Sequence, residues 1–455
     1  MIVLTHGYFL EEDPKEKRIM RPYVPLGILY ISGFLEQRQI THTVIDTTFI
    51  SFDQFCKRLE TEAPKLMGIY TNLMTKLNVI KTISFVKSHP HLKTCKIILG
   101  GPEIRHNAEN YLKQGADMLV VGEGEETFYE LCEYYNTHGH LPETCEGTAY
   151  LKAGALIQNP ERKLIRDINL LPMPARHAID LRLYGDAWKK FHGYSMYSMS
   201  TMRGCPYTCK WCSRAVYGGT YRRRSPKLVV DEMEFLRNTY QPDQIWFVDD
   251  VFTISHKWLK EFRDEVVQRE VKIPYEIITR ADRMNAEVID LLKESGCFRI
   301  WIGAESGSQD IIDAMDRRVD VTVVRDMIIQ SKKKGMEAGT FIMLGYPGET
   351  KKDIRLTIQH LKAADPSFYT ITLAYPITGT PLHEEVKDTM EVKGSWAETT
   401  DRETQLKRNY SNKFYVHALR WVYHEMNAHQ SKKPVKRVGF KLRALASQVF
   451  MALNQ

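Results

Sequence analysis

The sequence lacks the features of a membrane-spanning, secreted or disordered protein. No apolar run reaches the roughly 18 residues that a spanning helix needs. Residues 1–6 contain neither a basic segment nor a small-residue cleavage site, so we expect a first β-strand there and no signal peptide. The 43% hydrophobic and 26% charged content is ordinary for globular proteins and excludes a disordered or collagen-like chain. These absences predict a folded, cytoplasmic protein.

The main body also carries almost no net charge. The 63 basic and 56 acidic residues give a net charge of +7, but residues 401–455 hold eleven Lys/Arg and three Asp/Glu, a net of +8. The first 400 residues therefore sum to −1. This body offers no electrostatic argument for a nucleic-acid partner, and we expect none.

Cysteine is sparse, but it is clustered in one place. Five of the eight cysteines are scattered singly, and the other three form a Cys-x-x-x-Cys-x-x-Cys segment at Cys205, Cys209 and Cys212. Because a reducing cytoplasm disfavours a disulfide framework, one tight cluster indicates a metal site.

Residues 1–145 alternate between short apolar runs and helical stretches, which predicts a Rossmann-like, doubly wound α/β domain. Ligands of such domains bind at the carboxyl ends of the strands. The loops expected there contain Thr71, Gly100, Gly101 and Glu123. The expected strands are Ile2–Thr5, Thr43–Asp46, Leu66–Tyr70, Lys96–Leu99 and Met118–Val121.

A second alternating series follows a proline-stiffened connector at residues 146–190. Its six strand–helix units over residues 191–390 are too few for a closed eight-stranded barrel, so we expect a partial (βα)6 barrel. Residues 391–455 are expected to be a basic, helical C-terminal region. Its apolar residues at helical spacing are Val438, Leu442, Leu445 and Val449. This stripe either packs on the body of the protein or forms a membrane-surface helix.

The cysteine segment follows the first expected strand of the barrel, at the end where such folds place their chemistry. Three thiolates on a short loop can hold three irons of a [4Fe–4S] cluster and leave the fourth iron open to a ligand. The alternative is structural zinc, but that metal takes four ligands, and no fourth Cys or His lies at suitable spacing.

A Cys-x-x-x-Cys-x-aromatic-Cys segment in this position resembles that of the radical SAM superfamily. The resemblance implies that Cys205, Cys209 and Cys212 are the cluster ligands and that Trp211 lies beside the adenosyl group. It also implies that S-adenosylmethionine (SAM) chelates the open iron and is cleaved to a 5′-deoxyadenosyl radical.

The resemblance extends to further residues that would contact SAM. Asp249 and Asp250 stand where many members have Gly-Gly-Glu to hold the SAM amino group, although Asp250 could instead be a helix N-cap. Glu305, in a Gly-Ala-Glu-Ser-Gly-Ser segment, would accept hydrogen bonds from ribose hydroxyls. Arg280 would pair with the SAM carboxylate, or it could form a structural salt bridge.

The N-terminal domain resembles that of the cobalamin-binding branch of the superfamily. The similarity lies in Pro25-Leu26-Gly27, Gly100-Gly101, residues 122–127 and the Leu-Pro-Met-Pro-Ala-Arg connector at 171–176. It implies a corrinoid near Thr71, Gly100, Gly101 and Glu123. The Asp-x-His-x-x-Gly motif of many cobalamin domains is absent, because Asp46 is followed by Thr47 and Thr48, so cobalamin would bind without a histidine ligand.

These resemblances imply an enzyme that uses a [4Fe–4S] cluster, SAM and cobalamin, most simply a C-methyltransferase. Two alternatives stay open: a cyclase or ring-rearranging enzyme without methyl transfer, and a non-enzymatic cobalamin or iron–sulfur carrier. The expected partners are a small-molecule or lipid substrate and an external electron donor such as flavodoxin or ferredoxin. The basic tail adds a possible peripheral membrane contact.

Overall fold

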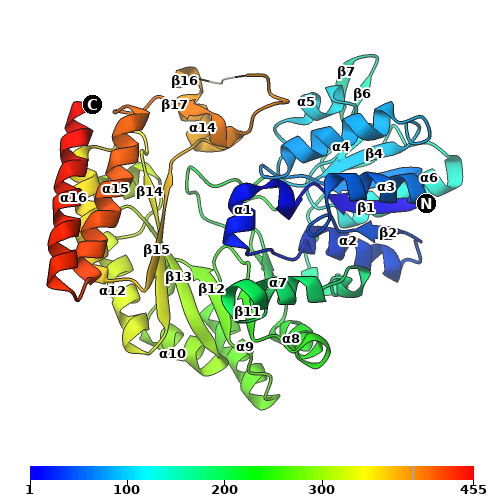
Figure 1. Cartoon of the computed structure of the whole chain (residues 1–455). Coiled ribbons are helices and arrows are strands. Elements are labelled where there is room, and N and C mark those ends of the chain that lie inside the picture. The colour runs from blue at the N-terminus through cyan, green and yellow to red at the C-terminus, as the bar shows by residue number, and fades with distance from the viewer. Residues whose placement is uncertain (392–393, 455) are drawn as a thin grey trace. The chain divides into compact units, whose positions relative to one another are not determined.

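The computed structural model describes residues 1–391 and 394–454, which form two compact units (Figure 1). The first unit comprises residues 1–206, 213–246 and 392–403, and the second comprises residues 207–212, 247–391 and 404–455. Within the described residues, no helix is both long enough and apolar enough to cross a membrane. The four segments predicted from the sequence do not coincide with these two units, and their boundaries stay a prediction.

The first unit is built on a seven-stranded sheet in the order β2-β1-β3-β4-β5-β6-β7. The first five strands in this order are parallel, and β6 and β7 extend them as an antiparallel hairpin. The bounds are β1 Ile2–His6, β2 Thr43–Ile45, β3 Leu66–Tyr70, β4 Lys96–Gly100, β5 Met118–Val120, β6 Thr148–Lys152 and β7 Ala155–Gln158. The predicted doubly wound domain is confirmed.

The helices of this unit begin and end where local sequence dictates. For example, α3 starts with a capping box in which Ser51 and Gln54 satisfy each other's backbone N–H groups. Its buried residues, Phe52, Phe55 and Leu59, join the core under the sheet. The helices are α1 Pro14–Ile19, α2 Leu26–Gln37, α3 Phe52–Glu62, α4 Lys76–Ser88, α5 Ala108–Lys113, α6 Glu125–His138, α7 Arg182–His192 and α8 Pro226–Tyr240.

The second strand–helix series forms a six-stranded sheet in the order β15-β14-β13-β12-β11-β8. All six predicted strands are present, and β12 to β15 pair in parallel. The strands are β8 Met196–Met199, β11 Gln244–Phe247, β12 Tyr275–Thr279, β13 Cys297–Glu305, β14 Glu337–Leu344 and β15 Phe368–Leu373. The intervening helices are α9 His256–Gln268, α10 Ala286–Ser295, α11 Gln309–Ala314, α12 Val321–Lys333 and α13 Lys351–Ala364.

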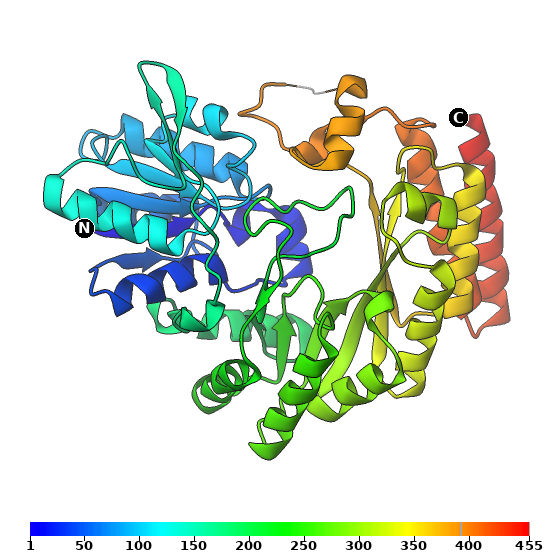
Figure 2. The ribbon, with the colours of Figure 1, turned by 180° about the vertical axis from the view of Figure 1, so that it is seen from behind.

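The chain then continues through α14 Pro381–Val386 to a helical C-terminal region, as predicted. There α15 Asn412–Gln430 and α16 Pro434–Leu453 lie side by side (Figures 1 and 2). Two short ribbons complete the fold: β9 Met202–Arg203 with β10 Arg222–Arg223, and β16 Met390–Glu391 with β17 Gln405–Leu406.

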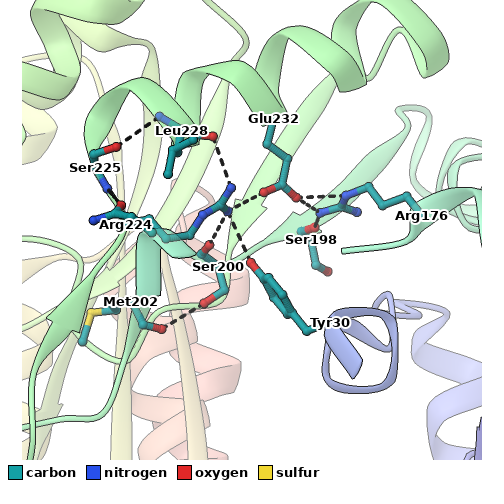
Figure 3. A network of polar contacts seen from close by, with 10 residues as sticks. Tyr30, Arg176, Ser198, Ser200, Met202, Arg224, Ser225, Leu228 and Glu232 are labelled. Carbon is teal, nitrogen blue, oxygen red and sulfur yellow. Dashed lines mark hydrogen bonds and ion pairs between the residues drawn. The ribbon is translucent and has the colours of Figure 1, made fainter. Parts of the chain in front are cut away.

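A fully buried glutamate joins three segments of the first unit (Figure 3). Glu232 on α8 accepts hydrogen bonds from Arg176 Nε at 3.0 Å and Nη2 at 2.6 Å, and it also pairs with Arg224. Arg176 ends the Leu-Pro-Met-Pro-Ala-Arg segment of the connector and donates to the Ser198 carbonyl at 2.8 Å, while Arg224 donates to the Ser200 carbonyl at 3.2 Å. The two guanidinium groups hold the pKa of Glu232 below its usual range, although burial alone would raise it.

We predict that Glu232→Gln lowers the free energy of unfolding by about 3 kcal/mol, because it removes the buried negative charge that Arg176 and Arg224 share. Chemical denaturation followed by circular dichroism measures this loss. Glu109→Gln on α5 breaks a solvent-exposed ion pair with Lys113 and should shift the curve by about 0.5 kcal/mol or less. Equal shifts for the two variants would contradict the assigned role of Glu232.

Candidate active site

The predicted ligand-binding loops of the first unit lie at one edge of its sheet. Strands β1, β3, β4 and β5 are parallel, so their carboxyl ends share that edge, and the strand order reverses between β1 and β3. Such a switch point is where ligands of doubly wound sheets bind. Thr71 follows β3, Gly100 and Gly101 end and follow β4, and Glu123 follows β5. The fold therefore brings these four residues to the same edge.

The two adjacent glycines at this edge differ in whether a side chain could replace them. Gly101 has φ +111°, and a Cβ there would lie 2.2 Å from the Thr71 carbonyl oxygen, so the backbone itself demands glycine. At Gly100 the nearest atom to an added Cβ would be the Val120 carbonyl oxygen at 3.9 Å. The space beside Gly100 is thus open to a ligand that approaches the backbone closely.

Glu123 already accepts several hydrogen bonds from the protein. Its carboxylate pairs with Arg203 at 2.8 Å and Arg222 at 2.6 Å, and it accepts from the Ile165 N–H at 2.8 Å. Arg203 also pairs with Glu125 at 2.5 Å. These buried ion pairs fasten the loop after β5 to the β9–β10 ribbon, just before the cysteine segment. Contact of Glu123 with a corrinoid stays a prediction.

A histidine that the sequence analysis did not single out lies at the end of β1. His6 Nδ1 accepts a hydrogen bond from the Tyr8 N–H at 3.1 Å, so its Nε2 carries the proton that is shared with Asp46 at 3.0 Å. Tyr184 donates to the other Asp46 oxygen at 2.9 Å. Burial would raise the pKa of Asp46, but its contacts with His6 and Thr48 lower it. Both imidazole nitrogens are thus engaged within the unit.

The cysteine segment begins in the first unit. Cys205 follows Gly204, whose φ is +83° and whose added Cβ would lie 2.2 Å from the Thr220 carbonyl oxygen. Only glycine fits this close approach of two backbone segments. The turn that presents Cys205 is therefore set by the backbone.

Residues 207–212 belong to the second unit and are anchored there by backbone hydrogen bonds. The Lys210 N–H donates to the Met315 carbonyl at 3.1 Å, and its carbonyl accepts from the Leu382 N–H at 2.9 Å. In this segment Cys209 is buried and Cys212 is exposed. Across residues 1–391 and 394–454, no three His, Cys, Asp or Glu side chains could hold a single metal ion. The thiolates of a [4Fe–4S] cluster, in contrast, bind separate irons.

Arg280, directly after β12, contacts the cysteine segment. Its Nη1 donates to Cys209 Sγ at 3.4 Å, and its guanidinium lies 3.9 Å from the centre of the Tyr207 ring. It also pairs with Asp282 at 2.9 Å and donates to the Arg317 carbonyl at 2.7 Å. The structural salt bridge considered for Arg280 is present. Its contact with sulfur is of the kind that tunes the potential of an iron–sulfur cluster.

Glu305 lies at an irregular point of β13. The register with β14 shifts between Gly303 and Glu305, and Glu305 has φ +64°, a conformation that turns its side chain away from the regular strand pattern. Burial raises the pKa of its carboxyl, which lies 3.7 Å from Arg317. The same guanidinium lies 5.7 Å from the centre of the Trp211 ring. Arg317, which the sequence analysis missed, therefore connects two predicted SAM-binding residues.

Asp249 and Asp250 follow β11, and Asp249 is buried. Burial and the neighbouring Asp249 raise the pKa of Asp250. The N-cap interpretation of Asp250 is wrong, because α9 begins at His256 and is capped by Ser255. Asp249 and Asp250 are thus adjacent at this strand end, and their contact with the SAM amino group stays a prediction.

Comparison with known proteins identifies both domains. The model of the B12 binding domain matches residues 20–132, and that of the Radical SAM superfamily matches residues 199–361. A protein of Pyrococcus horikoshii named as an uncharacterized methyltransferase is 26% identical over 409 residues, which cover 88% of this chain and 86% of that protein.

Two further relatives show the range of the likeness. The anaerobic magnesium-protoporphyrin IX monomethyl ester cyclase of Cereibacter sphaeroides is 24% identical over 81% of this chain and 61% of its own length. The solved structure of the radical SAM methyltransferase TsrM from Kitasatospora setae, with cobalamin and a [4Fe–4S] cluster bound, has a TM-score of 0.75 and 15% identity and covers 99% of both chains.

The B12 binding match contains Gly100 and its sheet edge. The Radical SAM match contains the segment with Cys205, Cys209 and Cys212. The family uses SAM, an iron–sulfur cluster and cobalamin, and its members are enzymes. By this combination the chain belongs to the cobalamin-binding radical SAM family.

Proposed function

We propose that this enzyme transfers a methyl group to a carbon atom of a small-molecule or lipid substrate. The observation that carries the proposal is the presence in one chain of a glycine-lined sheet edge and a cysteine segment contacted by Arg280. When bound, the cofactors supply a 5′-deoxyadenosyl radical, which abstracts hydrogen, and a methyl group. The polypeptide binds and orients them.

The residues divide between two binding tasks in this proposal. Thr71, Gly100, Gly101 and Glu123 would line the corrinoid site, with Gly100 allowing the closest approach. The cluster would be held by the thiolates of Cys205, Cys209 and Cys212.

Around the proposed SAM site, each polar group suits one part of the ligand. The carboxyl groups of Asp249 and Asp250 would accept from the amino group, and Glu305 would accept from ribose hydroxyls. Arg280 would face the SAM carboxylate while it keeps its contact with Cys209. Trp211, partly buried against an apolar cluster that contains Ile311 and Tyr346, would lie beside the adenosyl group.

A cyclisation or ring rearrangement without methyl transfer is the second candidate, because one relative is named as a cyclase. Methyl transfer converts SAM into S-adenosylhomocysteine, whereas radical formation yields 5′-deoxyadenosine. If the protein is a methyltransferase, the reduced holoenzyme should form both S-adenosylhomocysteine and 5′-deoxyadenosine while it converts its substrate. Formation of 5′-deoxyadenosine alone would favour the cyclase. An intact cluster with no SAM cleavage would favour a carrier.

The proposed setting is the cytoplasm, where a flavodoxin or ferredoxin would supply the electron. We also propose peripheral contact of the C-terminal region with a membrane, since that region holds most of the excess positive charge.

We predict that replacing any of Cys205, Cys209 and Cys212 by alanine abolishes the iron–sulfur absorbance and SAM cleavage, because each thiolate holds one iron. Cys297→Ala is the matched control: this thiol is buried at the start of β13, and its loss should leave both signals intact. Iron and sulfide content, the visible spectrum and 5′-deoxyadenosine are measured. A fully loaded cluster in Cys209→Ala would refute the ligand assignment.

We predict that Gly100→Leu prevents corrinoid binding while the iron–sulfur spectrum and melting temperature are retained, because its side chain would occupy open space at the sheet edge. Gly100→Ala should lose much less corrinoid. Gly101 is the poorer test, since any side chain there meets the Thr71 carbonyl and strains the backbone. The measurement is the corrinoid absorbance per mole of protein after anaerobic reconstitution of each variant. Full corrinoid loading of Gly100→Leu would place the corrinoid elsewhere.

A further inference from the structure

Helix α16 has two apolar faces, and only one is covered. Ala444, Ser447 and Met451 are its buried residues, and α16 packs along α15 (Figure 2). The predicted stripe lies on another face and is open: the exposed fractions are 59% for Val438, 63% for Leu442, 58% for Leu445 and 54% for Val449. The interpretation in which this stripe packs on the body of the protein is therefore wrong.

The open stripe is longer than the sequence analysis indicated. Val435 and Leu453 extend it at spacings of three and four residues and are 86% and 74% exposed, so the stripe runs the length of the 20-residue helix. Phe450, 50% exposed, borders it. A contiguous exposed apolar surface of this kind marks an interaction site.

The charges beside the stripe indicate what covers it. Residues 431–454 contain six basic side chains and no acidic one: Lys432, Lys433, Lys436, Arg437, Lys441 and Arg443. Lys441 and Arg443 adjoin Leu442, so positive charge flanks the apolar residues. An anionic lipid headgroup region matches both features, because acyl chains accept the apolar face and headgroups attract the cations.

A second copy of α16 also fits the spacing of three and four residues, which is that of a coiled-coil seam. Its charges oppose this pairing, however. Two copies would bring basic flanks together with no acidic residue of this helix to offset them. The observations thus favour a lipid surface over self-association.

We infer that α16 lies in the plane of an anionic membrane surface, with the 435–453 stripe in the headgroup–acyl boundary and its basic residues on the headgroups. The inference rests on the proposed peripheral contact and names its chemistry. It is independent of methyl transfer, because no residue of α16 is assigned to cofactor binding.

Co-sedimentation of the full-length holoenzyme with vesicles tests the inference. At low salt the protein should bind vesicles that contain phosphatidylglycerol and should bind pure phosphatidylcholine vesicles weakly. Leu442→Glu with Leu445→Glu should reduce binding at least tenfold. Lys436→Gln with Lys441→Gln should reduce it by roughly fivefold for each charge removed. Added salt should weaken the wild-type interaction.

Val267→Glu on α9 is the matched control, because Val267 is an exposed apolar residue (54%) outside the stripe, and its replacement should leave binding unchanged. All variants should retain SAM cleavage, which separates failure of this inference from failure of the proposed reaction. Equal binding by the wild type and the double glutamate variant would overturn the inference. The inference would also be overturned if the wild type formed a dimer and did not bind vesicles, while the double glutamate variant was monomeric.

Discussion

The strand that leads into the cysteine segment depends on one buried carboxylate. Glu232 is fully buried, and such a charge is tolerated only when it is paired and hydrogen-bonded. Arg176 and Arg224 meet this need, and they also bind the Ser198 carbonyl of β8 and the Ser200 carbonyl just after it, respectively. The proline-rich connector thus has a physical purpose, because it delivers Arg176 to the carboxylate. Three segments distant in sequence are joined at this point.

A second set of buried ion pairs also fixes backbone near the cysteine segment. Arg203 binds Glu123 and Glu125, and Arg222 binds Glu123, so the loop after β5 is fixed to the ribbon from which Cys205 emerges. In the second unit, Arg280 and the backbone of Lys210 fix Cys209. Preorganisation of this kind suits radical chemistry, in which the protein must orient a reactive species and exclude water. The arginines of the first unit thus hold backbone segments in place, whereas Arg280 is also the proposed partner of the SAM carboxylate.

Much of this could be predicted from the sequence where the signal is local. The bounds of β3 match those predicted, and those of β1 and β4 differ by one residue, since short apolar runs define these strands. The hairpin β6–β7 was missed because its two strands are only five and four residues long, and residues 148–158 were all assigned to the connector. His6 pairs with Asp46 across 40 positions, and Arg317 reaches Glu305 only through an irregular strand. No local pattern encodes such contacts. Gly101 was predicted for ligand access, but its backbone conformation already requires glycine.

In the proposed enzyme, the cysteine segment holds a cluster whose open iron binds SAM. The most direct measurement is electron–nuclear double resonance on the reduced, cobalamin-loaded protein with SAM that carries a nitrogen isotope in its amino group. We predict a hyperfine coupling from that nitrogen to the cluster, and the coupling should weaken when Asp249 and Asp250 are both replaced by alanine. A reduced cluster that shows no coupling to SAM at saturating concentration would contradict the account.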